Sequence, residues 1–240
     1  MSATTSSEPA VAAAPLSLAG AFARAREAGR AALIPYVTAG HPSPEATPEV
    51  LRMLAEEGAD VIELGVPFSD PLADGPTIQK SSFDAIERGT DLRWTLEALR
   101  GFRAESDVPV VLFTYLNPVL RYGVDAFLRD AAEAGAQGVL LTDLPVGSDP
   151  ELERAFAESP LDLVRLIAPT TTPARLREIA AAGRGFLYYV SRTGVTGAQA
   201  ELQEGLEREV AAVRAAAAVP VAVGFGISTP EQAAAVARVA

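Results

Sequence analysis

The chain has 240 residues, of which 49% are hydrophobic, a formal net charge of -11 at pH 7 and no cysteine. This size and hydrophobic content suit one α/β domain, and no apolar run is long enough to cross a bilayer, so we expect a soluble protein. The negative charge argues against nucleic acid or an anionic membrane as a partner, and the lack of cysteine excludes disulfides and thiolate chemistry.

Residues 1–15 consist of Ala, Ser, Thr, Pro and Val after the initial Met, with a single charge at Glu8. This composition is typical of a disordered tail and lacks the arginines or apolar core of a targeting signal. We therefore expect one folded domain over residues 16–240.

From residue 16 onward, short apolar runs alternate with amphipathic helical stretches. A leading helix is predicted at 16–28, followed by strands near 32–38, 60–66, 109–115, 138–142, 162–168, 186–190 and 220–224. Helices are predicted near 44–57, 77–88, 91–105, 123–134, 149–158, 173–182, 202–217 and 229–239.

The strands are nearly continuous apolar runs, as expected in a parallel sheet with both faces covered. A doubly wound sheet would show the same alternation, but no G-x-G-x-x-G follows the first strand, so we predict a (β/α)8 TIM barrel. Only seven strands are counted, so the eighth strand is missing at the C-terminal end of the predicted barrel. Such a barrel would keep two unpaired strand edges.

The most informative segment is the second strand and the loop that follows it. Glu63 lies among apolar residues of the strand, where a charge is costly unless it is paired, neutralised or used. Asp70 and Asp74 follow in a loop rich in Pro and Gly. A buried acid before an acidic loop is typical of an acid/base site, although a satisfied buried acid and two turn residues would give the same pattern.

The only histidine is His41 and the only lysine is Lys80. A Ser-His-Asp relay or a multi-histidine metal site would depend on His41, which lies in a loop, and a Schiff base would need Lys80, which lies on a predicted surface helix. We therefore predict no metal site, and catalysis by carboxylates, hydroxyls and backbone N–H groups.

Two glycine-rich loops could bind an anion. The loop 191–197 follows the sixth strand and could fold over a ligand, although an ordinary flexible loop would look the same. The turn Gly224–Gly226, before a helix capped by Ser228 or Thr229, is at the usual phosphate position of a barrel; a plain tight turn is the alternative.

Large side chains near the strand ends could line an apolar pocket, although packing of the barrel core would explain most of them equally well. They are Tyr36, Phe113, Tyr115, Leu140, Ile167, Tyr188 and Phe225.

Taken together, these residues resemble the tryptophan synthase alpha chain family, from about Leu16 to Ala240. The motifs that carry the resemblance are Ile34–Pro42, Glu63–Pro76, Tyr115–Val119, Thr142–Pro145, Tyr188–Gly197 and Gly224–Ile227. The first nine residues of the second motif, Glu-Leu-Gly-Val-Pro-Phe-Ser-Asp-Pro, are very specific.

The resemblance implies a (β/α)8 lyase that cleaves indole-3-glycerol phosphate to indole and glyceraldehyde 3-phosphate, in the cytoplasm. It implies that Glu63 is the general acid/base, that Asp74 holds the indole N–H, and that Tyr188 lies beside Glu63. It further implies roles for four loop residues and one strand residue: Thr196 pairs with Asp74, Gly197 and Gly226 bind the phosphate, and Phe225 and Tyr36 flank the indole.

The resemblance also implies an α2β2 complex with a beta chain that carries pyridoxal phosphate, and no cofactor in this chain. Pro67, Phe68, Asp70 and Asn117 lie on matching interface loops, so Asp70 would serve contact rather than chemistry.

Three alternatives stay open. Another phosphate-binding barrel, such as indole-3-glycerol phosphate synthase or a Schiff-base aldolase, would normally need a lysine on a strand, and no predicted strand has one. A non-catalytic subunit that only activates its partner would keep the interface loops, and a truncated barrel could be inactive and unable to fold alone.

Overall fold

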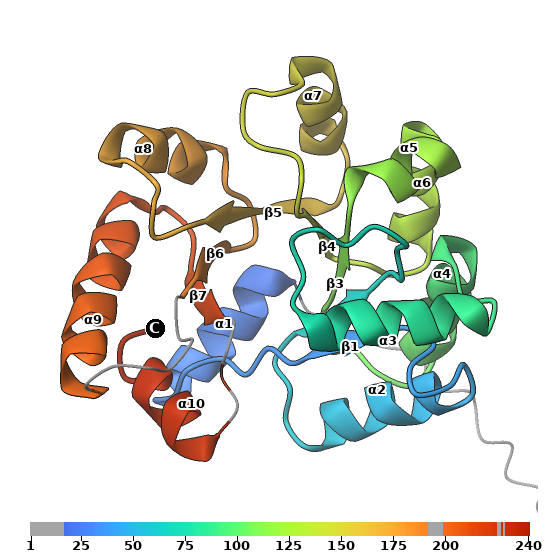
Figure 1. The fold of residues 1–240 in the computed structure, drawn as a ribbon, viewed down its shortest axis with the longest axis horizontal. Coiled ribbons are helices and arrows are strands. Elements are labelled where there is room, and N and C mark those ends of the chain that lie inside the picture. Colours follow the sequence, from blue (N-terminus) through green and yellow to red (C-terminus); the bar gives the residue numbers. More distant parts are fainter. Residues whose placement is uncertain (1–16, 192–198, 225–226, 228) are drawn as a thin grey trace, which may run out of the picture.

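The computed structural model describes residues 17–191, 199–224, 227 and 229–240. The predicted N-terminal tail and most of the loop 191–197 lie outside these residues. The described chain has seven strands and ten helices, with one or two helices after each strand (Figure 1). In the same residues, no helix is long and apolar enough to cross a membrane.

The strands are β1 (Tyr36–Thr38), β2 (Ile62–Gly65), β3 (Val110–Thr114), β4 (Gly138–Leu141), β5 (Asp162–Ile167), β6 (Leu187–Val190) and β7 (Val221–Gly224). The helices are α1 (Leu18–Glu27), α2 (Ala46–Glu56), α3 (Pro76–Glu87), α4 (Leu92–Arg103), α5 (Leu116–Tyr122), α6 (Val124–Glu133), α7 (Pro150–Glu158), α8 (Pro173–Ala182), α9 (Gln199–Ala216) and α10 (Pro230–Ala237). All predicted elements are present, mostly with ends a few residues shorter.

The seven strands form one sheet in the order β1-β2-β3-β4-β5-β6-β7, and each pairs with the next in parallel. Figure 1 shows the strands curling around a centre with helices outside them. This is the β/α architecture of a TIM barrel, so the fold prediction is confirmed. Seven strands are found in the described residues, and β1 and β7 are the edges of the sheet.

Residues alternate between the two faces of each strand, and this alternation decides which side chains enter the barrel. On β2, Ile62 and Leu64 pack outward in the core beneath the helices, whereas Val61, two residues before Glu63, belongs to the interior cluster. Glu63 therefore points into the barrel. The register places Tyr36 of β1 and Val111 of β3 directly beside it.

Helix α1 closes the amino-terminal end of the barrel. Leu18 and Ala21 are fully buried in the interior cluster, and the ring of Phe22 lies 5.4 Å from that of Phe186 just before β6. A side chain at Gly138 or Gly185 would overlap Leu18 or lie too close to it, which explains the glycine that begins β4 and the one just before β6.

A cavity of about 1430 Å³ runs along the edges of β1 and β7. Its lining includes residues that precede both strands as well as groups at their carboxyl ends, such as Asp74 and Ile78. The cavity therefore extends along the whole strand length and reaches the carboxyl-terminal face, where barrel enzymes place their active sites.

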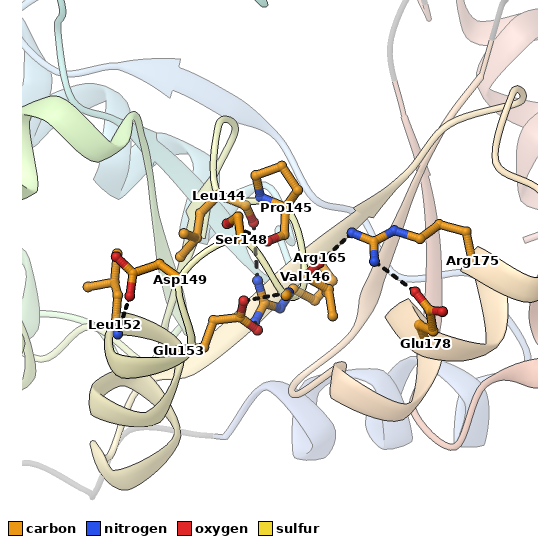
Figure 2. A network of polar contacts seen from close by, with 11 residues as sticks. Leu144, Pro145, Val146, Ser148, Asp149, Leu152, Glu153, Arg165, Arg175 and Glu178 are labelled. Carbon is orange, nitrogen blue, oxygen red and sulfur yellow. Dashed lines mark hydrogen bonds and ion pairs between the residues drawn. The ribbon is translucent and has the colours of Figure 1, made fainter.

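On the outer face of β5, a buried arginine fixes the loop between β4 and α7 (Figure 2). Arg165 is 6% exposed, pairs with Glu153 of α7 at 2.9 Å and donates to the carbonyl of Leu144 at 3.2 Å. From α8, Arg175 donates to the carbonyl of Val146 at 2.5 Å. Two arginines, one from β5 and one from α8, thus bond main-chain carbonyls of this loop and stabilise its conformation.

Helix α5 is the one described helix that the periodicity did not predict. It is short, and Pro118 stands in its first turn, where a missing N–H breaks no intrahelical bond. The carboxylate of Asp143 accepts the N–H of Leu116 at 2.7 Å, which stabilises the start of the helix. Asn117 therefore lies on a helix, and the prediction that it lies on a loop was wrong.

Candidate active site

Glu63 is the buried acid of the site. It lies on β2, is 2% exposed, and its Oε1 has no hydrogen-bond partner among the described residues. Burial raises the pKa of this carboxyl from 4.5 to about 8. Near neutral pH, Glu63 is therefore mainly protonated and able to donate a proton, and its conjugate base is a stronger base than an ordinary carboxylate.

Asp74 is the second acid, at the end of the loop between β2 and α3. It is half-buried, and the Tyr115 hydroxyl donates to its Oδ2 at 2.9 Å. Burial raises the pKa of Asp74, and this hydrogen bond opposes the rise by stabilising the anion. The two carboxyls therefore differ: Glu63 is buried with one oxygen unpaired, and Asp74 is partly solvated and hydrogen-bonded.

Aromatic rings surround Glu63 inside the barrel. Tyr36 and Phe113 lie edge to face with centroids 5.4 Å apart, and Tyr188 enters from β6. The Tyr36 hydroxyl fills the space beside Gly65, where a larger residue would overlap it. Burial raises the pKa of both tyrosines, and the negative charge of Glu63 adds to the rise, so both hydroxyls stay protonated.

The cavity that reaches the carboxyl-terminal face brings together the three predicted catalytic residues and two of the predicted substrate-binding residues. Its lining includes Tyr36, Glu63, Asp74, Phe113 and Tyr188. Leu140, also predicted to line the pocket, is fully buried in the interior cluster and does not belong to this lining. Thr196, Gly197, Phe225 and Gly226 lie outside the described residues, so their roles stay predictions.

The prediction that Ile167 lines the pocket was wrong. Its side chain packs outward, in the cluster that contains Ile179 of α8 and Val210 of α9. Because faces alternate along β5, the neighbouring Leu166 is the one that belongs with the interior cluster. β5 has a charged residue on each face, so charge did not indicate which face turns inward, and the sequence could not distinguish the two residues.

Ile78 and Phe22 are two of the cavity residues that were not predicted. Ile78 lines the cavity from the first turn of α3, and Phe22 lines it from α1. Ile78 lies in the first turn of the helix that follows the loop of Asp74, and this closeness in sequence could have indicated that the two lie together. No sequence signal linked Phe22 to the site, because the leading helix had no predicted partner.

The single histidine and the single lysine of the chain do not line this cavity. Lys80 is a surface residue of α3 that pairs with Asp84 at 2.9 Å, as predicted, and His41 lies 3.9 Å from the same carboxylate. No group of three possible ligands, His, Cys, Asp or Glu, is found among the described residues. The absence of a metal in catalysis stays a prediction.

The predicted interface residues differ in exposure. Asp70 and Asn117 are exposed and Phe68 is partly exposed, with its ring 5.1 Å from that of Tyr115. Pro67 is buried within this chain and offers a partner no exposed side chain.

Comparison with known proteins agrees with this geometry. The family model "Tryptophan synthase alpha chain" matches residues 22–240. The tryptophan synthase alpha chains of Geobacter sulfurreducens and Acidiphilium cryptum are each 49% identical to this chain, over 92% and 93% of it and 83% and 81% of their own lengths.

Solved structures give the same result. Tryptophan synthase subunit alpha from Legionella pneumophila superposes with a TM-score of 0.85 at 38% identity, covering 93% of this chain and 83% of that one. A chain of M. tuberculosis tryptophan synthase in its aminoacrylate-bound form gives 0.84 at 39% identity, covering 93% and 86%. With a family model over most of its length and relatives at nearly half identity, the chain belongs to the tryptophan synthase alpha chain family.

Proposed function

We propose that Glu63 and Asp74 carry out the reaction of this family, the lyase cleavage of indole-3-glycerol phosphate to indole and glyceraldehyde 3-phosphate in tryptophan biosynthesis. The observation that supports these roles best is the buried, inward-pointing Glu63 with an unpaired oxygen, in one cavity with Asp74. A carboxyl whose pKa is raised to about 8 can act as acid and base at neutral pH.

Glu63 moves two protons in turn. Its protonated form delivers a proton to C3 of the indole ring, which leaves positive charge on the ring. The resulting carboxylate takes the proton of the glycerol hydroxyl, the carbonyl of the aldehyde forms, and the electrons of the broken C–C bond restore the aromatic ring. Glu63 ends the cycle protonated, so protons and electrons balance and no Schiff base is needed.

Asp74 stabilises the charge that develops between these two steps. Because Tyr115 occupies Oδ2 and no described residue bonds Oδ1, one carboxylate oxygen is available for the indole N–H. An anion at this nitrogen lowers the energy of the cationic ring. Tyr36 and Phe113 would contact the faces or edge of the indole, and Tyr188 would line the site beside Glu63.

The family also suggests the partner. We propose an α2β2 complex with a tryptophan synthase beta chain in the cytoplasm, with pyridoxal phosphate bound to the beta chain. The exposed Asp70 and Asn117 and the partly exposed Phe68 lie next to the site and would contact that chain. A beta chain seated there would receive indole directly from the cavity.

The test is indole release from indole-3-glycerol phosphate by the purified chain, with and without a beta chain. Glu63→Gln keeps the shape of the side chain and should abolish release, whereas Glu105→Gln, a surface residue paired with Arg52, should not. Wild-type turnover by Glu63→Gln would refute the assignment. Beta-chain activation by a folded chain that releases no indole would instead favour a non-catalytic partner subunit.

A further inference from the structure

The loop between β2 and α3 has few contacts with the rest of the barrel. Leu72 at its tip is 93% exposed, and Ala73 and Gly75 on either side of Asp74 are exposed as well. The main-chain hydrogen bonds within the loop join residues that are close in sequence. For example, the N–H of Asp74 donates to the carbonyl of Pro71 at 3.0 Å. A catalytic carboxylate in such a loop needs an external support.

Tyr115 supplies that support from the neighbouring β/α unit. It follows β3 directly, is buried, and its hydroxyl accepts the N–H of Ala73 at 3.0 Å while it donates to Asp74 at 2.9 Å. Its ring also packs against Phe68 at the start of the loop. Among the described residues, these two bonds are the only hydrogen bonds that join residues 67–75 to another β/α unit.

The base of Tyr115 is itself fixed. It is the residue before α5, whose first N–H is held at 2.7 Å by the carboxylate of Asp143, two residues after β4. The main chain that carries the Tyr115 ring is thus fixed by the segment that follows β4, and not by the loop between β2 and α3.

We propose that Tyr115 is a positioning residue that holds Asp74 in its working orientation, with Oδ2 engaged and Oδ1 directed to the substrate. This inference rests on the role of Asp74 in the proposed function. It differs from the sequence-based expectation that Tyr115 binds substrate, because the hydroxyl is occupied by the loop and the residue does not line the cavity.

The position of Tyr115 also affects the charge of Asp74. The titratable groups near Asp74 are Tyr36 of β1 and Glu63 of β2, which line the cavity with it, and Tyr115, which bonds it from outside the cavity lining. Of these, Tyr115 is the donor bonded to the carboxylate, and removing it takes away the interaction that opposes the rise in pKa caused by burial. Asp74 would then be protonated at a higher pH and would lose the charge that the reaction uses.

The experiment is steady-state kinetics of Tyr115→Phe in the full chain with its beta chain. Phenylalanine keeps the ring against Phe68 and removes only the hydroxyl. Loss of a charge-assisted hydrogen bond should lower kcat about 10- to 100-fold, with a much smaller change in KM. The acid limb of the pH profile should also move to higher pH, which a purely structural role would not cause.

Tyr122→Phe is the matched control. Its hydroxyl also donates to an aspartate, Asp130 at 2.6 Å, but on the outside of the barrel. It should leave kcat, KM and the pH profile unchanged. Urea unfolding of both variants checks that the native fold is retained.

A double-mutant cycle separates this inference from the proposed function. If Tyr115 acts through Asp74, Tyr115→Phe should have little further effect on the residual turnover of Asp74→Asn. An inactive Asp74→Asn beside a Tyr115→Phe of wild-type kcat and pH profile would overturn the positioning role alone. A raised KM with unchanged kcat would assign Tyr115 to substrate binding instead, and wild-type turnover by Asp74→Asn would overturn the role of Asp74 itself.

Discussion

Glu63→Gln should make the protein more stable at neutral pH while it removes activity. The pKa of Glu63 is about 8 in the folded chain and 4.5 as an ordinary carboxyl. At pH 7 the unfolded chain is about 2.5 pH units above the pKa of this carboxyl and carries a carboxylate, which must take up a proton on folding. This proton uptake costs about 3 kcal/mol, at about 1.36 kcal/mol per pH unit. Glutamine is neutral at every pH and avoids this term.

The sign of the pH dependence follows from the same shift. Because the folded pKa is raised, the wild-type chain has its full stability from this group below pH 4.5 and loses it as the pH rises toward 8. The difference in free energy of unfolding between Glu63→Gln and wild type should thus increase between these two pH values and stay constant above them.

Urea unfolding of both chains between pH 4.5 and 9 measures this difference, with Glu105→Gln as the control for loss of an exposed glutamate. The control should show no such increase. A difference for Glu63→Gln that does not change with pH would refute the raised pKa, and with it the claim that Glu63 is protonated when substrate arrives.

Two further predictions concern the scaffold. Arg165→Met leaves the partly buried Glu153 without its partner and should lower the free energy of unfolding by about 3 kcal/mol; an unchanged urea midpoint would show that the ion pair adds nothing to stability. Gly65→Ala would overlap the Tyr36 hydroxyl and should raise the KM for indole-3-glycerol phosphate at least several-fold by moving that ring. Gly101→Ala, on α4 with open space around it, should leave KM unchanged, and equal KM values for the two variants would contradict this explanation.

The sequence was a good guide where a signal is local and a poor one where the answer depends on packing. Apolar runs and glycine stops located all seven strands, and Glu63 was found because it is a charge in an apolar strand. The face of Ile167 was predicted wrongly because β5 has one charged residue on each face, Asp162 and Arg165, so charge did not indicate which face turns inward. The role of the Tyr115 hydroxyl could not be predicted, because its partners Ala73 and Asp74 are distant in sequence.

The closure of the barrel by α1 has a consequence for synthesis of the protein. Leu18 and Phe22 leave the ribosome early, but Phe186, the ring that Phe22 packs against, is made only after the residues of the first five strands. The apolar face of α1 therefore lacks its contact with Phe186 for most of translation. Apolar surface that is exposed during this period favours aggregation. Docking of the first helix would be one of the last steps of folding.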